Sequence, residues 1–226
     1  MVGIIGAMEE EISAIKQLMT DIKVIEIASL TFFKGKIENK NVVLAKSGIG
    51  KTLSALTTTI LVSNFDLDFV INVGTAGGIK EEINPLDVIV SKRVAQSDFD
   101  LTEFGYKQNF DEKRISFNAD ENLIEQLRTL NLDNVIFGDI VSSDTFISNQ
   151  DQVNKILNNF PSALCADMEA GSIAMTLDHF KIPFIVIRSI SDVVGSDINN
   201  AIAFKEYLKI ASKRSANITK QLIKNL

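Results

Sequence analysis

Acidic side chains follow apolar runs of this sequence at places where they could handle protons. The first is Glu11, which comes after the run VGIIG in the stretch IIGAMEEE. At about 100° per residue, a helix beginning here has an apolar stripe that includes Glu11, whereas Glu9 and Glu10 point away from it. A carboxylate on a buried face needs a reason, and acting as a general base is one. The structural alternative is that first-turn glutamates simply stabilise the helix dipole.

Asp192 could supply the matching acid. In the stretch IPFIVIRSISD, an almost purely apolar strand leads into Arg188 and then into Ser191 and Asp192 at its carboxyl end. Burial would raise the pKa of Asp192 toward neutrality, so that it could donate a proton while Ser191 orients it. Of these two carboxyl groups in separate environments, one would then act as the general acid and the other as the general base. The charges of Arg188 and Asp192 would face the ligand together, unless Arg188 belongs to a structural ion pair with a neighbouring loop.

Two further segments are ambiguous. CADMEA places Met168 and Glu169 at the start of a helix, where Glu169 shares a row with Ile173 and Phe180 at the edge of the buried face. VGTAGG, residues 73–78, follows an apolar strand, and its glycines would let the backbone turn sharply and approach a ligand. A plain glycine-rich turn is the commoner explanation of such a motif.

The stretch AKSGIGKT, residues 45–52, raises the possibility of a cradle for nucleotide phosphates. It fits a permissive P-loop pattern, with Ala45 in place of the first glycine, between a short strand and a helix. A P-loop enzyme also needs an apolar strand that ends in a magnesium-binding aspartate. The nearest candidate is Asp139 in VIFGD, where the apolar run is short and interrupted by glycine. The P-loop enzyme is therefore a remote alternative.

Composition argues against several other classes of protein. The net charge of −6, with no Lys/Arg cluster among aromatics, predicts no nucleic-acid partner. No run approaches about 18 apolar residues, so no membrane span is expected. The one histidine, His179, has no Cys or His neighbour at ligand spacing, so neither a metal, a cofactor nor a Ser-His-Asp triad is expected. One cysteine, Cys165, and an N-terminus without a basic leader predict a cytoplasmic protein without disulfides.

Alternating strand and helix patterns must position these groups. Several apolar runs are continuous, which is typical of strands buried on both faces. The predicted strands are 2–6, 23–29, 30–37, 41–46, 68–74, 86–96, 134–141 and 182–190. The predicted helices are 9–19, 51–62, 121–130, 151–160, 168–180 and 201–226. We expect one domain over residues 1–226, a three-layer α/β fold, and a ligand at the carboxyl ends of the strands.

The motifs GIIGAMEEE, KSGIGK, VGTAGG, FGY, DMEA and RSISD occur in this order over nearly the whole chain. With these motifs in this order and at these separations, the sequence resembles the 5'-methylthioadenosine/S-adenosylhomocysteine nucleosidase family. The resemblance implies a nucleoside phosphorylase/hydrolase-like α/β/α fold with a central mixed, twisted sheet. It also implies hydrolysis of the adenine–ribose bond of 5'-thioadenosines, and of 5'-deoxyadenosine, in methionine salvage and methyl-cycle detoxification.

The resemblance implies a role for each carboxylate. Asp192 would protonate adenine at N7, and Glu11 would align and deprotonate water. Glu169 would bind the ribose hydroxyls and stabilise the cationic sugar, while Met168 would lie against the ribose. These roles suit the chemistry, because cleavage of an N-glycosidic bond leaves positive charge on the sugar and negative charge on the purine.

Further substrate-binding residues are implied at matching positions. The water and ribose side would include Thr75 and Arg188. The adenine side would include Phe146, Ser191 and the backbone of Ile147. The remaining walls, partly around the 5'-thio group, would be Ala7, Met8, Ile49 and Phe204. The family is typically a homodimer in which the neighbour lends side chains to the pocket, here Leu101, Phe104 and Tyr106.

The sequence departs from the family pattern at several positions. Thr75 stands where serine is usual, and Asp167 replaces the usual glutamate before Met168. SSDTF lacks a common glycine, and AQSDFDLTEFGY lacks a common Tyr-His pair. These changes bear on substrate preference and rate more than on reaction class.

Two rivals share the expected pocket. A purine nucleoside phosphorylase would need a positive phosphate cradle, yet Glu9 and Glu10 flank Glu11, and Asn72 stands where related phosphorylases have arginine. A catalytically inactive nucleoside sensor is the other rival, and the presence of both acid and base counts against it.

Overall fold

The computed structural model describes residues 1–194 and 200–226, and side chains over 1–194 and 207–226. Its strands are β1 (Val2–Gly6), β2 (Thr20–Ile27), β3 (Leu30–Ile37), β4 (Lys40–Lys46), β5 (Phe69–Gly78), β6 (Val88–Gln96), β7 (Ser116–Asn118), β8 (Val135–Ser142), β9 (Ala163–Asp167) and β10 (Phe184–Val193). Its helices are α1 (Glu9–Lys16), α2 (Lys51–Asn64), the 3-10 turn η1 (Thr102–Phe104), α3 (Glu121–Thr129), α4 (Gln150–Asn159), α5 (Ala170–Phe180) and α6 (Asn200–Asn225).

The strands form one mixed sheet that is open at one end and closed at the other. The open part runs β2-β3-β4-β1-β5, with β1 parallel to both β4 and β5. Beyond β5 the strands close into a ring, because β5 pairs with both β10 and β9, and β6 and β8 lie between those two. The central mixed sheet of an α/β fold is confirmed, and the closure of the ring is an additional finding.

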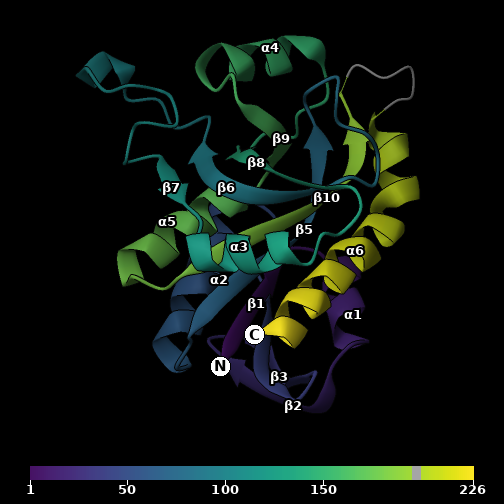
Figure 1. Ribbon diagram of the computed structural model, residues 1–226. Coiled ribbons are helices and arrows are strands. Elements are labelled where there is room, and N and C mark those ends of the chain that lie inside the picture. Colours follow the sequence, from purple (N-terminus) through teal and green to yellow (C-terminus); the bar gives the residue numbers. More distant parts are fainter. Residues whose placement is uncertain (195–199) are drawn as a thin grey trace.

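Helices cover the sheet on both sides (Figure 1). The helix α2 packs on α5 along one side, while α1 packs on α6 along the other. Strand β1 is buried along its whole length, and β10 is buried except at Val193. Burial on both faces explains why these strands appear in the sequence as continuous apolar runs.

The ladder between β5 and β10 is irregular near its carboxyl end. Arg188 pairs with Gly74 and Ile190 with Ala76, but Asp192 pairs with Gly77, so β10 has one extra residue. Successive residues of a strand face opposite sides, and an inserted residue reverses the alternation beyond it. Asp192 therefore faces the side opposite to that of Arg188 and Ile190.

All eight predicted strands and all six predicted helices are present, with ends that differ by a few residues. The short strands β7 and β9 were not predicted. The turn expected in VGTAGG is wrong, because β5 continues through Gly78. Positive φ values among the described glycines occur at Gly48, Gly50 and Gly105 instead.

Candidate active site

A pocket of about 190 Å³ lies where β1, β9 and β10 end and where the second half of β5 passes, between the loops that follow β4 and β8. The predicted residues that line it are Ala7, Met8, Glu11, Ile49, Thr75, Phe146, Ile147, Met168, Glu169, Ser191 and Asp192. Residues that were not predicted to line it are Ala76, Gly77, Thr145, Ala166 and Asp167. These five adjoin predicted residues in the chain, so extending each motif by one or two positions would have found them.

Glu11 is held in the pocket wall by backbone amides. Its Oε2 accepts hydrogen bonds from the N–H groups of Ala7 at 2.8 Å and Met8 at 3.0 Å. Its Oε1 accepts from the N–H of Thr75 at 3.0 Å and from the Thr75 hydroxyl at 3.3 Å. Burial raises the pKa of Glu11, and the charge of Arg188 and these hydrogen bonds oppose the rise. The result is a fixed carboxyl group suited to accept a proton.

Two glycines of β5 leave room for the carboxyl groups. A Cβ on Gly74 would lie 2.7 Å from Glu11 Oε1, and one on Gly77 would lie 3.2 Å from Asp192 Oδ2. Neither glycine is among the residues with positive φ. Their function is close approach rather than a turn.

Asp192 is buried, with only 1% of its surface exposed. The Ser191 hydroxyl donates to its Oδ1 at 2.8 Å. Its Oδ2 is buried and has no hydrogen-bond partner among the described residues. Burial raises the pKa of Asp192, and the bond from Ser191 only partly opposes this. An unpaired carboxyl oxygen in a pocket wall can hold a proton ready for a ligand.

Glu169 lies inside the buried region, at 7% exposure, and not at its edge as the sequence suggested. It precedes α5 as the N-cap residue, with φ −133° and ψ −38°, so the helical row used for the prediction does not apply to it. Its Oε1 accepts a hydrogen bond from the N–H of Gly50 at 2.9 Å. Burial, followed by the negative charge of Asp167, raises the pKa of Glu169 to about 8.

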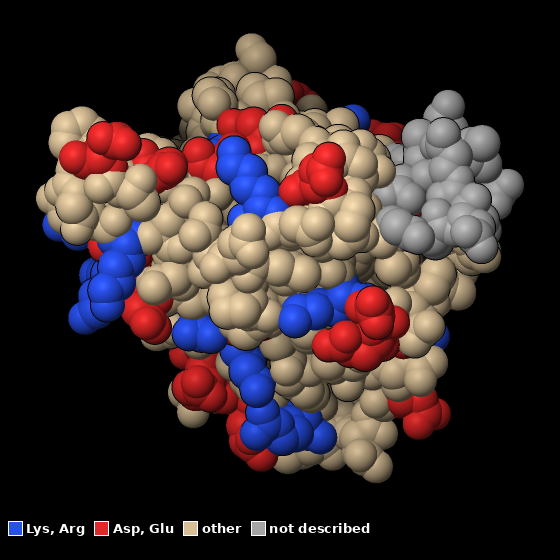
Figure 2. Space-filling view, turned by 90° about the horizontal axis from the view of Figure 1, so that it is seen from above, with Lys and Arg blue, Asp and Glu red and all other residues tan. Residues whose placement is uncertain are grey.

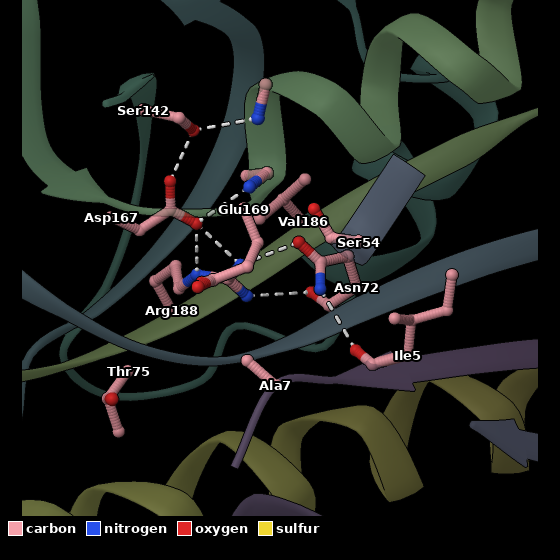
Figure 3. A network of polar contacts seen from close by, with 12 residues as sticks. Ile5, Ala7, Ser54, Asn72, Thr75, Ser142, Asp167, Glu169, Val186 and Arg188 are labelled. Atoms are coloured by element: carbon pink, nitrogen blue, oxygen red, sulfur yellow. Dashed lines mark hydrogen bonds and ion pairs between the residues drawn. The ribbon is translucent and has the colours of Figure 1, made fainter. Parts of the chain in front are cut away.

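Arg188 is fully buried and is not among the residues that line the pocket. Figure 3 shows it among its polar partners Asp167 and Asn72. Its Nε and Nη2 donate to Asp167 Oδ2 at 2.9 and 2.6 Å, and Nη2 also donates to Asn72 Oδ1 at 2.6 Å. The hydroxyl of Ser142 donates to the other carboxylate oxygen of Asp167. The expected presentation of Arg188 and Asp192 to the ligand as a charge pair is therefore wrong. Arg188 instead forms the structural pair with a neighbouring segment that was the alternative.

The pocket is completed by apolar side chains. Ile49 is 54% exposed and Phe146 42% exposed, so both present surface that a ligand could cover. The side chain of Phe204 lies outside the described residues. Leu101, Phe104 and Tyr106 do not line this pocket. They belong to the segment around η1, where Phe104 is 77% exposed.

The loop AKSGIGKT does not form a phosphate cradle. The N–H of Gly50 donates to Glu169, and the N–H of Lys51 donates to Asp144 Oδ1 at 2.8 Å. The ammonium group of Lys51 contacts Asp98 Oδ1 at 2.6 Å. Carboxylates thus occupy the donors that a P-loop would offer to phosphate.

The proposed magnesium ligand of a P-loop enzyme is also engaged elsewhere. Asp139 accepts from Arg93 Nη2 and from the Ser162 hydroxyl, each at 2.6 Å. It does not line the pocket. Across the described residues, no group of three or more His, Cys, Asp and Glu side chains could hold a metal ion. Within the same residues, every helix is too short or too polar to cross a membrane.

Comparisons with known proteins agree over the whole chain. A family model described as the phosphorylase superfamily matches residues 1–224. A 5'-methylthioadenosine/S-adenosylhomocysteine nucleosidase from Staphylococcus haemolyticus is 40% identical over 230 residues, which is 100% of each chain. The crystal structure of such a nucleosidase from Neisseria meningitidis, in complex with methylthio-immucillin-A, superposes with a TM-score of 0.92 at 34% identity, covering 100% of this chain and 99% of that one. The native structure of futalosine hydrolase from Helicobacter pylori superposes with a TM-score of 0.91 at 30% identity, covering 100% and 97%.

Proposed function

Because the chain belongs to the phosphorylase superfamily and, within it, to the 5'-methylthioadenosine/S-adenosylhomocysteine nucleosidases, we propose that it hydrolyses the N-glycosidic bond of these two nucleosides. The products are adenine and the 5'-substituted ribose, and 5'-deoxyadenosine is a further substrate. The observation that carries the proposal is the pairing of Glu11 with Asp192 in one pocket. Both are buried carboxyl groups with raised pKa values, and Asp192 has a free oxygen.

Asp192 is the general acid. The bond between C1' of the ribose and N9 breaks, and its electron pair moves into the purine ring. A proton from Asp192 Oδ2 to N7 neutralises the developing negative charge, so adenine leaves as a neutral molecule. Ser191 fixes the other oxygen through its 2.8 Å hydrogen bond, which keeps the proton-bearing oxygen directed at the base.

Glu11 is the general base for water. Its two oxygens are held by the amides around Ala7 and Thr75, which leaves the carboxylate no freedom to turn away from the pocket. A water molecule attacks C1' and gives its proton to Glu11. Solvent exchange then returns the proton from Glu11 and restores the proton of Asp192, so the cycle balances.

Glu169 and Met168 bind the sugar. The pKa of about 8 for Glu169 belongs to the pocket without ligand. Hydrogen bonds from the ribose hydroxyls would favour its charged form, which then stabilises the cationic ribose of the transition state. Phe146 stacks on adenine beside the backbone of Ile147, while Ile49, Met8 and Ala7 surround the rest of the nucleoside. Thr75 keeps a hydroxyl on the water side.

Hydrolysis is favoured over phosphorolysis by the charges around the pocket. None of its described lining residues is Lys or Arg. The nearest buried cation, Arg188, is paired with Asp167 at 2.6 Å. A phosphate dianion would therefore meet the carboxyl groups of Glu11 and Glu169 without a free cation to neutralise it.

The test is turnover of 5'-methylthioadenosine by the purified protein, with and without phosphate, followed by separation of the products. The proposal expects free 5-methylthioribose and adenine at a rate that is independent of phosphate. S-adenosylhomocysteine, 5'-deoxyadenosine and futalosine should be run in parallel, because the futalosine hydrolase shares the fold. Formation of the ribose 1-phosphate derivative would show that the reaction is phosphorolysis and not hydrolysis. Cleavage of futalosine alone would show that the substrate is futalosine. Binding without turnover would identify a sensor.

The proposal also covers assembly and location. The active form is a homodimer, in which Leu101, Phe104 and Tyr106 of each protomer reach the pocket of the other. The 77% exposure of Phe104 supports this, since an apolar ring so exposed suits a contact with a second chain. Light scattering with a Phe104→Ala variant tests it. We also propose a single domain over residues 1–226 in the cytoplasm.

Small molecules, rather than nucleic acids, are the ligands in this proposal. Figure 2 shows Lys and Arg mixed with Asp and Glu on the face seen there, and the net charge is −6. A polyanion would gain little from such a surface.

A further inference from the structure

Lys51, the lysine of the P-loop-like stretch, has no place in the proposed chemistry, yet its side chain is only 15% exposed. Its ammonium group lies 2.6 Å from Asp98 Oδ1 and 3.9 Å from Asp144 Oδ2. Its backbone N–H donates to the other oxygen of Asp144 at 2.8 Å. One residue therefore contacts two carboxylates that come from two different loops.

These loops are joined to each other at the same place. The N–H of Asp144 donates to Asp98 Oδ2 at 2.9 Å. Immediately before these residues, the N–H and the hydroxyl of Ser97 donate to the carbonyl of Ser142 at 2.9 and 3.1 Å. Asp144 lies two residues before Phe146, in the loop that forms the adenine side of the pocket. The position of Phe146 is therefore tied to this cluster.

The first turn of α2 holds a second part of the pocket as well. The N–H of Gly50, directly before Lys51, donates to Glu169 on the ribose side. Adjacent amides at the start of α2 thus bind the ribose carboxylate and the adenine loop. The ammonium group of Lys51 lies against both Asp98 and Asp144, and without this cation the two carboxylates would repel each other.

We propose that Lys51 is a positioning residue that holds the Phe146 loop against the N-terminus of α2 and so sets the width of the adenine site. This inference rests on the proposed function. Lys51 does not line the pocket, and its charge pairs with Asp98 and Asp144 rather than with Glu11 or Asp192. Glu11 and Asp192 are held by amides and a hydroxyl outside this cluster, so their chemistry is independent of Lys51.

The test compares Lys51→Met with a matched control, Lys220→Met. Lys220 also forms a carboxylate pair, with Glu38 at 3.0 Å, and neither residue is in or next to a segment that lines the pocket. In Lys51→Met, KM for 5'-methylthioadenosine and Kd for adenine should each rise about tenfold, while kcat changes by less than about threefold. Loss of a partly exposed ion pair should lower Tm by no more than about 4 °C, which separates this effect from unfolding.

A second change distinguishes repulsion from a simple loss of packing. Asp98→Asn combined with Lys51→Met removes one of the two facing charges and should restore at least half of the lost adenine affinity on a logarithmic scale. KM and Kd within twofold of the wild type in Lys51→Met, an equal rise in Lys220→Met, or no recovery in the double variant would each overturn the inference. A wild-type chain without hydrolytic turnover would instead remove the proposed function.

Discussion

The change of Asp192 to asparagine separates proton donation from every other role of this side chain. The Ser191 hydroxyl donates to Oδ1 at 2.8 Å, so in Asp192→Asn the amide oxygen keeps that position and the NH2 group takes the place of Oδ2. This group can donate a hydrogen bond to adenine but cannot transfer a proton. General acid catalysis contributes about 100- to 10,000-fold, or about 3–5 kcal/mol of transition-state stabilisation. Turnover should fall by that factor, while Kd for adenine changes by less than about threefold.

Three measurements check this prediction. Adenine release gives kcat, calorimetric titration with adenine gives Kd, and thermal denaturation at pH 8 gives Tm. Since burial disfavours the charged form of Asp192, the neutral amide should leave Tm equal or higher. The wild-type rate should also fall with rising pH as Asp192 loses its proton, and this limb should be absent from the variant. Turnover within tenfold of the wild type, with adenine affinity intact, would refute the assignment of Asp192 as the acid.

Other groups around the pocket give predictions of the same kind. Since the folded chain holds the proton of Glu169 up to about pH 8 and an ordinary glutamate releases it near 4.5, stability should fall as pH rises between these values, and Glu169→Gln should flatten that decline in Tm. Arg188→Met should lower stability by about 3–5 kcal/mol in denaturant titrations because it leaves Asp167 buried and unpaired, and Asp167→Asn in the same chain should recover part of this. In Gly74→Ala the new Cβ would lie 2.7 Å from Glu11 Oε1 and displace that carboxylate, so kcat measured by adenine release should fall at least about tenfold. An unchanged kcat would mean that the carboxylate has room to move.

The pattern of apolar residues predicted most of this fold because its strands are long and buried. β1 has no polar side chain, and β10 begins with an unbroken apolar run, residues 184–187. The two strands that were missed are short. β7 has three residues, and β9 has five residues that directly precede a predicted helix. Closure of the ring depends on pairings of β9 with β5 and of β10 with β6, which join distant segments and leave no local signal.

The candidate site was predictable where a side chain follows a strand directly, and less so where its partner is distant in sequence. Glu11 was placed correctly on the buried stripe of α1. The burial of Glu169 was misjudged because helical periodicity was applied to a residue that precedes the helix. The partner of Arg188 is Asp167, and no spacing within RSISD could reveal it. The Lys51 cluster likewise joins Lys51 to Asp98, which is 47 positions away in the chain, and to Asp144, which is 93 positions away.

The extra residue in β10 decides which side of the strand the acid Asp192 faces. Ile190 pairs with Ala76 and Asp192 with Gly77, whereas in a regular ladder Ser191 would pair with Gly77 and Asp192 with Gly78. The aspartate would then turn to the other side of the strand, toward the region where Arg188 lies. A change that forced β10 into the regular ladder would therefore remove the acid from the pocket, with its carboxyl group still present in the chain. The register of this strand segment is as much a part of the active site as the identity of its last acidic residue.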